Sequence, residues 1–190
     1  MSEETAKTWK RILSEKLADC RVFDVYRDVC VDSDTEESEA TFYRLECPDW
    51  CNIIGLTNNN EVILIEQFRQ GIQKITLEIP GGIVDEGEDV KEAAARELLE
   101  ETGYASNEIF SLGTAHPNPA IQNNRVHMFL ATNCEKKQEP QFDSHEHAVT
   151  RVVPLDEVSN LIETEQITHS LVLDGLLRFF LRQNEFIKTK

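Results

Sequence analysis

Three glutamates stand close together near the middle of this 190-residue chain, in the stretch RELLEET. Glu97, Glu100 and Glu101 are spaced i, i+3 and i+4, so in a helix their carboxylates converge on one side. Ionised carboxylates turned toward a protein body would repel one another and lose hydration, so a cation must accompany them. Arg96 could neutralise one glutamate but not three. Oxygen ligands without histidine or cysteine favour magnesium, manganese or calcium over zinc.

A helix over about residues 89–102 is expected to position these carboxylates. At about 100° per residue, Ala93 and its neighbour Ala94 fall on either side of Val90 and form a narrow stripe of small residues. The glutamates at 97 and 101 fall inside the same stripe. The sequence therefore predicts that the helix presses this side against a sheet.

Glycines flank the predicted helix. Gly81 and Gly82 would let backbone carbonyls approach a metal without an intervening Cβ. Gly103 is expected at the position that ends the helix. An alternative interpretation is a solvated acidic helix face paired with nearby lysines and arginines.

The same stretch contains glycines, glutamates and one arginine at fixed spacings: Gly82, Glu88, Arg96, Glu97, Leu98, Glu100, Glu101, Gly103 and Tyr104. This set resembles the Nudix box at every defined position except the last, where Tyr104 replaces the usual aliphatic residue. The flanking segments EQFRQG and EIPGG, with a proline-rich loop, extend the likeness to much of residues 50–155.

The resemblance implies hydrolysis of a nucleoside diphosphate linked to another group, with Mg²⁺ (Mn²⁺ as an alternative) as cofactor and two or three ions in each site. It implies metal ligands that are carboxylates and one backbone carbonyl: Glu97, Glu100, Glu101 and Gly81. Glu100 is also expected among the catalytic residues. It implies structural roles for the remaining box residues: Gly82, Glu88, Arg96 and Gly103.

Several features resemble the subgroup that acts on ADP-ribose and other nucleoside diphosphate sugars, which would give AMP and ribose 5-phosphate from ADP-ribose. Arg69 and Glu78 match substrate-site positions of that subgroup, and Pro119 lies sixteen residues beyond Gly103, where those enzymes carry a characteristic proline. The alternatives are an ion pair of Arg69 with Glu66 or Glu78, and a loop-shaping role for the proline. After Pro119, the sequence AIQNNR departs from the subgroup, because it carries amides where many members have an acidic residue.

Aromatic side chains are the candidates for stacking on the nucleobase, since aromatic faces suit purines. Trp50 is the first candidate, with Tyr26 or Phe23 beside it. Each of them is also suited to packing in the core.

The expected general base lies in the loop EPQFDSHEHAV. Alignment of the following strand with the subgroup places Glu146 at the base position. Asp143, His145 and His147 are competitors, and a histidine has a suitable pKa without adjustment.

Two other functions remain open at this point. One is hydrolysis of a different nucleoside diphosphate derivative, such as a dinucleoside polyphosphate or a coenzyme A-like diphosphate. The other is a catalytically silent Nudix domain that binds a nucleotide or joins a complex. The complete set of three glutamates argues against the silent form.

The order of elements predicts α+β or α/β layers. The resemblance implies a Nudix fold, an α/β fold of the α+β sandwich type with a mixed sheet between helices. An antiparallel strand pair is expected over residues 21–31 and 40–47, preceded over residues 8–18 by a short helix or an extended arm. We expect residues 1–48 to serve in dimerisation and nucleobase binding, and residues 49–190 to form the catalytic domain. In the subgroup that it resembles, such a strand pair exchanges between the protomers of a homodimer.

Composition excludes some partners. The net charge of −16 leaves no basic stripe for a nucleic acid polymer. No stretch reaches the roughly 18 apolar residues of a membrane span, and the N-terminus lacks a secretory signal. The five cysteines form an odd set with no CxxC pair, which favours a reducing compartment and a cytoplasmic location.

Overall fold

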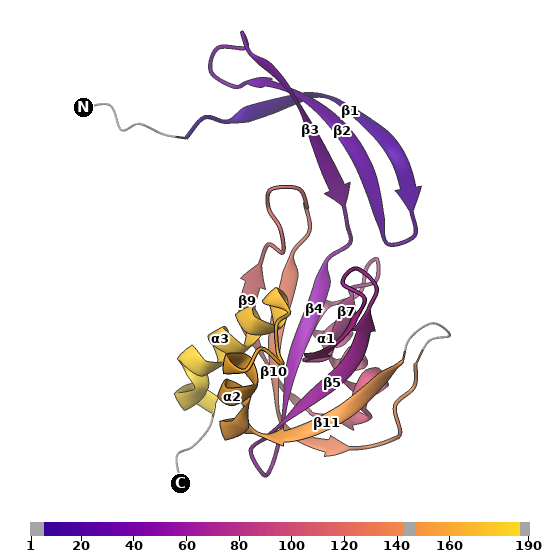
Figure 1. The fold of residues 1–190 in the computed structure, drawn as a ribbon, viewed down its shortest axis with the longest axis vertical. Coiled ribbons are helices and arrows are strands. Elements are labelled where there is room, and N and C mark those ends of the chain that lie inside the picture. The colour runs from indigo at the N-terminus through magenta and orange to yellow at the C-terminus, as the bar shows by residue number, and fades with distance from the viewer. Residues whose placement is uncertain (1–5, 143–146, 187–190) are drawn as a thin grey trace, which may run out of the picture. The chain divides into compact units, whose positions relative to one another are not determined.

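The computed structural model describes residues 6–142 and 147–186. The chain divides into two compact units, one made of residues up to Pro48 with His116–Asn124, and the other of Asp49–Ala115 with the residues from Arg125 onward. The elements in chain order are β1 (Trp9–Cys20), β2 (Phe23–Asp32), β3 (Glu39–Glu46), β4 (Trp50–Thr57), β5 (Glu61–Arg69), β6 (Lys74–Glu78), β7 (Gly81–Ile83), α1 (Val90–Thr102), β8 (Tyr104–Ala105), β9 (Glu108–Ala115), β10 (Val126–Lys136), β11 (Ala148–Pro154), the 3₁₀ helix η1 (Leu155–Glu157), α2 (Val158–Glu163) and α3 (Ser170–Phe186) (Figure 1).

The first unit contains a three-stranded antiparallel sheet in the order β1-β2-β3. The expected pair of strands over 21–31 and 40–47 is confirmed as β2 and β3. The helix considered for residues 8–18 is wrong, and the extended alternative is right. β1 pairs with β2 from Trp9 to Cys20, across a tight turn that places Cys20 opposite Phe23. In this pairing the backbone N–H and C=O groups of β1 bond to β2, whereas in a helix they would bond to one another.

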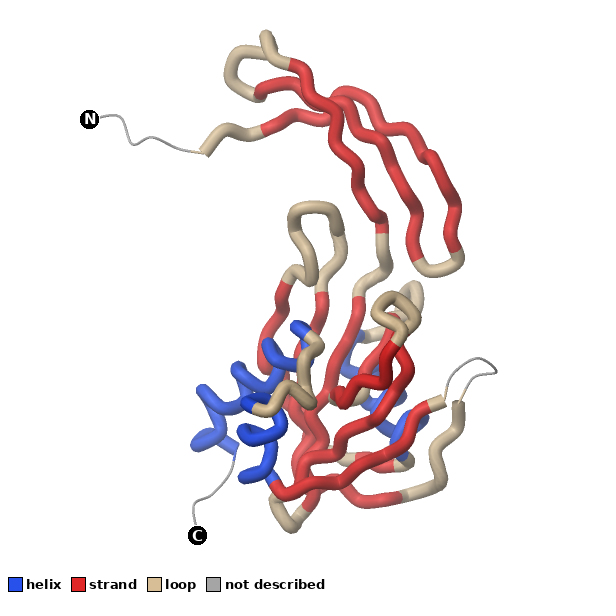
Figure 2. Tube along the Cα trace, viewed as in Figure 1, coloured by secondary structure: helices blue, strands red, loops and turns tan. Residues whose placement is uncertain are grey.

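The second unit contains an eight-stranded mixed sheet. Its central order is β11-β5-β4-β10-β8, while β6 pairs with β5, β7 with β4 and β9 with β10. β4 and β10 run parallel, and the other pairs are antiparallel. In Figure 2, α2 and α3 lie together while α1 lies apart from them.

Two hydrophobic clusters cover the two faces of this sheet. Along β4, Ile54 and Leu56 enter the cluster that contains α2 and α3, whereas Cys51 and Ile53 enter the cluster that contains α1. β5 and β10 alternate in the same way, as expected for strands with both faces buried. The sheet is therefore enclosed by helices, and the predicted α+β sandwich is confirmed.

The C-terminal helix α3 buries an apolar stripe made of these residues: Leu171, Val172, Gly175, Leu176 and Phe179. The short elements β7, β8 and α2 were not expected from the sequence. Within the described part of the chain, every helix is too short or too polar to cross a membrane.

Candidate active site

The helix α1 carries the three glutamates, and both of its ends are fixed locally. The Asp89 carboxylate accepts hydrogen bonds from the backbone N–H groups of Lys91 and Glu92, at 2.9 and 3.2 Å. This is the N-cap arrangement that satisfies otherwise unpaired donors. Gly103 adopts the left-handed conformation with a φ of 77°, and its N–H donates to the Leu99 carbonyl. The helix ends where the sequence predicts.

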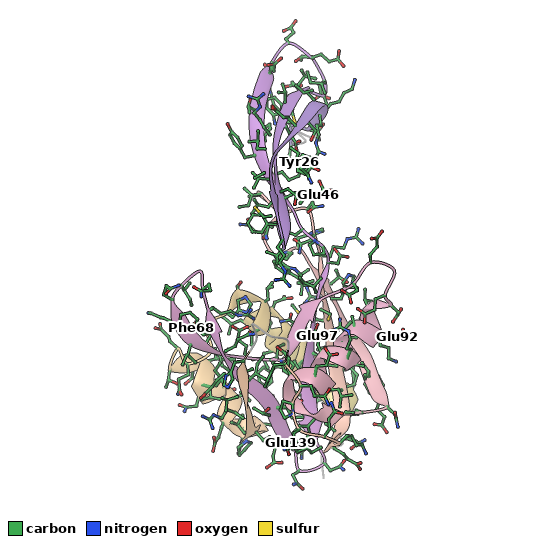
Figure 3. All side chains as sticks on the ribbon, turned by 90° about the vertical axis from the view of Figure 1, so that its right-hand side faces the viewer. Tyr26, Glu46, Phe68, Glu92, Glu97 and Glu139 are labelled. Carbon is green, nitrogen blue, oxygen red and sulfur yellow. The ribbon has the colours of Figure 1, made fainter. Side chains whose placement is uncertain are left out.

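One side of α1 packs against the sheet, as the alanine stripe predicts. Ala93, Ala94 and Leu98 are fully buried in the cluster on that face. Glu101 is buried with them, whereas Glu92 on the first turn is exposed. Figure 3 labels Glu97 and Glu92 on this helix. Since Glu97 has only 14% of its side chain exposed, the acidic residues of α1 are not equivalent.

The strand β7, which precedes α1 in the chain, approaches two of these carboxylates closely. The Gly81 N–H donates to Glu101 Oε2 at 2.9 Å. A Cβ at Gly82 would lie 2.6 Å from the Cδ atom of Glu97, so that carboxylate packs directly on the glycine backbone. A glycine is required at this position for the carboxylate to keep its place.

Arg96 is the shared partner of the remaining carboxylates. Its Nε and Nη2 atoms donate to the two oxygens of Glu88, at 2.9 and 3.0 Å. Its Nη1 atom donates to Glu97 at 2.8 Å and to Glu100 at 3.1 Å. The hydrogen bonds that Arg96 donates to Glu88, opposed by burial and reinforced by Glu97, hold the pKa of Arg96 above its ordinary value. The same contact lowers the pKa of the Glu88 carboxyl.

The donor set fits a hard divalent cation in its chemistry, because it consists of carboxylates beside a glycine backbone. Among the described residues, no group of three or more histidine, cysteine, aspartate or glutamate side chains is arranged to hold a metal ion. Glu97 and Glu100 instead meet at one nitrogen of Arg96, while Glu101 turns to the Gly81 amide. The structure thus brings two of the three predicted ligands together on a guanidinium.

A second cluster surrounds Glu78, which is only 1% exposed. Arg69 donates through Nε and Nη2 to its two carboxylate oxygens, at 2.8 and 2.7 Å. The Thr76 hydroxyl also donates to it, and His169 Nδ1 lies 3.0 Å from Oε2. Burial alone would raise the pKa of Glu78, but Arg69, His169 and Thr76 hold it well below its ordinary value.

Arg69 and Glu78 are the pair that the resemblance implies for substrate binding, and in the structure they contact each other. Glu66, the other partner considered for Arg69, pairs with Arg151 at 3.0 Å. His169 was missed by the sequence reasoning, because it lies 91 positions from Glu78 in the chain and follows no recognisable spacing.

The aromatic candidates and Pro119 lie in different surroundings. Trp50 begins β4 and packs, partly buried, against the core cluster that contains α3. The ring of Tyr26 lies under the Arg44 guanidinium, at 4.6 Å from its carbon. Pro119 is exposed and belongs to the unit that contains the N-terminal sheet.

The predicted base Glu146 lies outside the described residues, as do Asp143 and His145. His147 is exposed, and its ring lies 6.0 Å from that of Phe142.

Comparison with known proteins decides the family. The model of the NUDIX domain matches residues 51–174 of this chain. The chain belongs to the NUDIX domain family. The matched range contains the box, α1 and the whole Glu78 cluster of this Nudix domain.

Characterised relatives cover most of the chain. The ADP-ribose pyrophosphatase of Bacillus subtilis (strain 168) is 26% identical over 160 residues, which cover 83% of this Nudix protein and 85% of that one. The methanol dehydrogenase activator of Bacillus methanolicus is 29% identical over 189 residues, covering 99% and 97% of the two chains. A solved structure described as an ADP compounds hydrolase covers 97% of this chain and 99% of its own, with a TM-score of 0.84 and 21% identity, which establishes the likeness of fold.

Proposed function

We propose that this Nudix protein hydrolyses the diphosphate bond of nucleoside diphosphate sugars, with ADP-ribose giving AMP and ribose 5-phosphate. The observation that carries the proposal is the position of Glu97 and Glu101 beside Gly81-Gly82, with Glu100 joined to Glu97 through Arg96, on the helix of a chain that belongs to this family. The likeness to an ADP-ribose pyrophosphatase over 83% of the chain supports the substrate class.

Nudix hydrolases generally use divalent metal ions, and we propose Mg²⁺, with Mn²⁺ as a substitute, at two or three ions per site. The residues that would hold them are the three glutamates of α1 and the backbone carbonyl of Gly81. Bound there, the ions would polarise the diphosphate, favour deprotonation of water and neutralise the departing phosphate.

The chain's own residues have separate tasks in this scheme. Arg96 holds Glu88, Glu97 and Glu100 in fixed positions and offsets part of their mutual repulsion. The hydrogen bond from the Gly81 amide to Glu101 fixes β7 to the helix. Arg69, held by Glu78, would bind the substrate. Water attacks one phosphorus, the bond from that phosphorus to the bridging oxygen breaks, and two phosphate monoesters form.

A general base must accept the proton from the attacking water. We propose Glu146 for this role, supported by its position in the sequence two residues before β11 begins. Replacement by glutamine is expected to lower kcat at least about 100-fold without weakening substrate binding.

We further propose a homodimer in a reducing, cytoplasmic setting, with residues 1–48 serving in dimerisation and nucleobase binding and residues 49–190 as the catalytic domain. The dimer is supported by large apolar side chains that are exposed on the N-terminal sheet and its turn: Trp9, Ile12, Leu13, Leu17, Val22, Phe42 and Tyr43. Such exposure is typical of an interaction surface. A monomer by light scattering at micromolar concentration would contradict this part of the proposal.

A second candidate is a role in activating or joining another protein. It is favoured by the likeness to a protein named methanol dehydrogenase activator along 99% of the chain.

The test is a product screen. The full chain is incubated with magnesium and ADP-ribose, GDP-mannose, UDP-glucose, NADH or diadenosine polyphosphates, and nucleoside monophosphates are quantified. Release of AMP from ADP-ribose at the highest kcat/KM is the expected result. Preference for a dinucleoside polyphosphate would reassign the substrate, and inactivity on the whole panel would favour the second candidate.

A further inference from the structure

The buried carboxylate of Glu78 is contacted by two nitrogen-bearing side chains from distant parts of the chain. Arg69, at the end of β5, reaches it with two hydrogen bonds of 2.8 and 2.7 Å. His169, in the segment before α3, places Nδ1 3.0 Å from Oε2. Both contacting side chains reach solvent, with exposed fractions of 43% for Arg69 and 36% for His169, whereas Glu78 has 2% of its side chain exposed.

A buried carboxylate needs such partners, because without them nothing replaces the favourable interactions with water that it loses on burial. The two oxygens of Glu78 match the two donors of the guanidinium, which is the geometry that fixes an arginine most strongly. The Thr76 hydroxyl donates to Oε1, the same oxygen that Arg69 Nε contacts. His169 approaches the other oxygen, so each oxygen has one partner besides the arginine.

His169 is placed by the start of α3. Its carbonyl accepts the N–H of Leu173 at 3.0 Å, which joins the residue to the first turn of the helix. Ile79, the neighbour of Glu78, packs against α3 so closely that a Cβ at Gly175 would lie 3.2 Å from its Cδ1 atom. The helix therefore holds both the histidine and the strand that carries the carboxylate.

The Nδ1 atom of His169 is shielded from solvent and makes no well-aligned hydrogen bond within the described residues. Its distance of 3.0 Å to Glu78 is nevertheless within ion-pair range. At this distance the buried carboxylate stabilises the shielded ring nitrogen, and the ring restricts the positions that the carboxylate can take.

The cluster is connected to the box by a short, fixed segment. Between Glu78 and Gly82, the Pro80 carbonyl accepts the Ile53 N–H at 2.9 Å. The Gly81 N–H then donates to Glu101. The segment that follows Glu78 is thereby anchored to β4 and to α1.

We propose that His169 is a positioning residue that, through Glu78, fixes the Arg69 guanidinium for binding the substrate. This inference rests on the proposed function, in which Arg69 binds substrate. A guanidinium already held in place loses less side-chain entropy when it binds an anion or hydroxyl of the substrate. Loss of the histidine should consequently weaken binding more than it slows the chemical step.

The kinetic test compares two substitutions of the histidine in the full chain. His169→Ala is expected to raise KM for ADP-ribose about tenfold with kcat nearly unchanged. His169→Asn keeps an N–H donor near the position of Nδ1 and should restore KM to within about threefold of the original. Arg151→Gln, which breaks the exposed pair with Glu66 on the neighbouring strands, is the matched control and should leave KM unchanged. Equal KM values in all four proteins would overturn the inference.

A second readout does not depend on activity. The Nε–H signal of Arg69, assigned with Arg69→Lys, is followed by ¹⁵N NMR for its rate of exchange with water. Faster exchange in His169→Ala, with slower exchange regained in His169→Asn, is the expected result. Unchanged exchange in both variants would overturn the inference. If the unmodified protein releases no product from ADP-ribose, the proposed function fails, while the exchange rates still decide whether His169 fixes Arg69.

Discussion

The two carboxylate clusters of the second unit have opposite ratios of carboxylates to nitrogen-bearing side chains. At Arg96, three glutamates share a single guanidinium. At Glu78, one buried carboxylate is shared by Arg69 and His169. The first cluster has an excess of negative charge, and the second has an excess of groups that can donate hydrogen bonds. The acid-rich cluster consists of Glu88, Arg96, Glu97 and Glu100, with Glu101 on the same helix. The donor-rich cluster consists of Glu78, Arg69, Thr76 and His169.

This difference teaches how an acidic protein can act on an anionic substrate. With a net charge of −16, the chain repels a diphosphate at long range. The acid-rich cluster suits cations that can neutralise the phosphates, and the donor-rich cluster suits direct contact with the substrate. The first cluster is built by contacts within one short stretch of chain, whereas His169 joins the second from a distant segment.

The largest effect is expected at the acid-rich cluster. Glu97→Gln and Glu101→Gln should each lower kcat/KM for ADP-ribose at least about 100-fold, because each removes a charge needed for metal binding. The matched control is Glu92→Gln, an exposed glutamate on the first turn of the same helix. Wild-type rates for both variants at saturating magnesium would show that these residues are not metal ligands.

Removal of Arg96 should reveal the charge imbalance directly. Arg96→Gln is expected to lower the free energy of unfolding by about 1–3 kcal/mol, because Glu88, Glu97 and Glu100 lose their shared donor. Magnesium should recover part of this loss, since a bound cation offsets the same repulsion. Urea unfolding with and without magnesium measures both effects, and a loss that magnesium leaves unchanged would contradict the account.

Gly82 tests how closely the backbone of β7 must approach Glu97. Gly82→Ala places a Cβ 2.6 Å from the Cδ atom of Glu97, so the carboxylate must move. We expect kcat/KM to fall about tenfold, the cost of a ligand displaced by a fraction of an ångström. Gly71→Ala is the control, because a Cβ there meets no atom within 4 Å. Equal activity of the two variants would mean that the position of Glu97 is not critical.

The smallest effect is expected at the donor-rich cluster, where the free energy of unfolding should depend on pH. Because the folded protein holds the pKa of Glu78 below its ordinary value, the ionised form stabilises the fold at neutral pH. This contribution is complete above the ordinary glutamate pKa of about 4.3 and is lost as pH falls below it toward the folded value.

Glu78→Gln should accordingly be less stable than the unmodified protein at pH 7, and the difference should shrink between pH 5 and about pH 3. Urea unfolding across this range, with Glu66→Gln as the control for an exposed glutamate that pairs with an arginine, measures the difference. A difference that is constant with pH would show that the ionised carboxylate is not what stabilises the cluster.

The acid-rich cluster was largely predictable because its information is local. The i, i+3, i+4 spacing, the alanine stripe and the two glycine boundaries all act within one helix and one loop. Pairing of Arg96 with Glu100 follows the i, i+4 rule, but its contact with the adjacent Glu97 does not. That contact depends on how far Glu97 is turned toward the glycine backbone, which only the packed structure shows.

The donor-rich cluster was predictable only in part, because its members are far apart in sequence. Arg69 and Glu78 lie on adjacent strands of a hairpin, so their pairing was foreseen as one alternative. His169 directly precedes α3, and α3 packs on the face of the sheet opposite to α1. Its contact with Glu78 therefore depends on how α3 packs. The strand β1 was ambiguous for a different reason, since its pairing with the next strand, β2, decides its conformation.

The central claim is that the carboxylates of α1 support metal-dependent cleavage of a nucleoside diphosphate sugar. The most direct measurement is the amount of AMP and ribose 5-phosphate released from ADP-ribose by the full chain, with magnesium and again after complete chelation of divalent metals. The account predicts equal amounts of the two products with magnesium and loss of both after chelation. Cleavage that continues undiminished after chelation, or no cleavage with either magnesium or manganese, would contradict it.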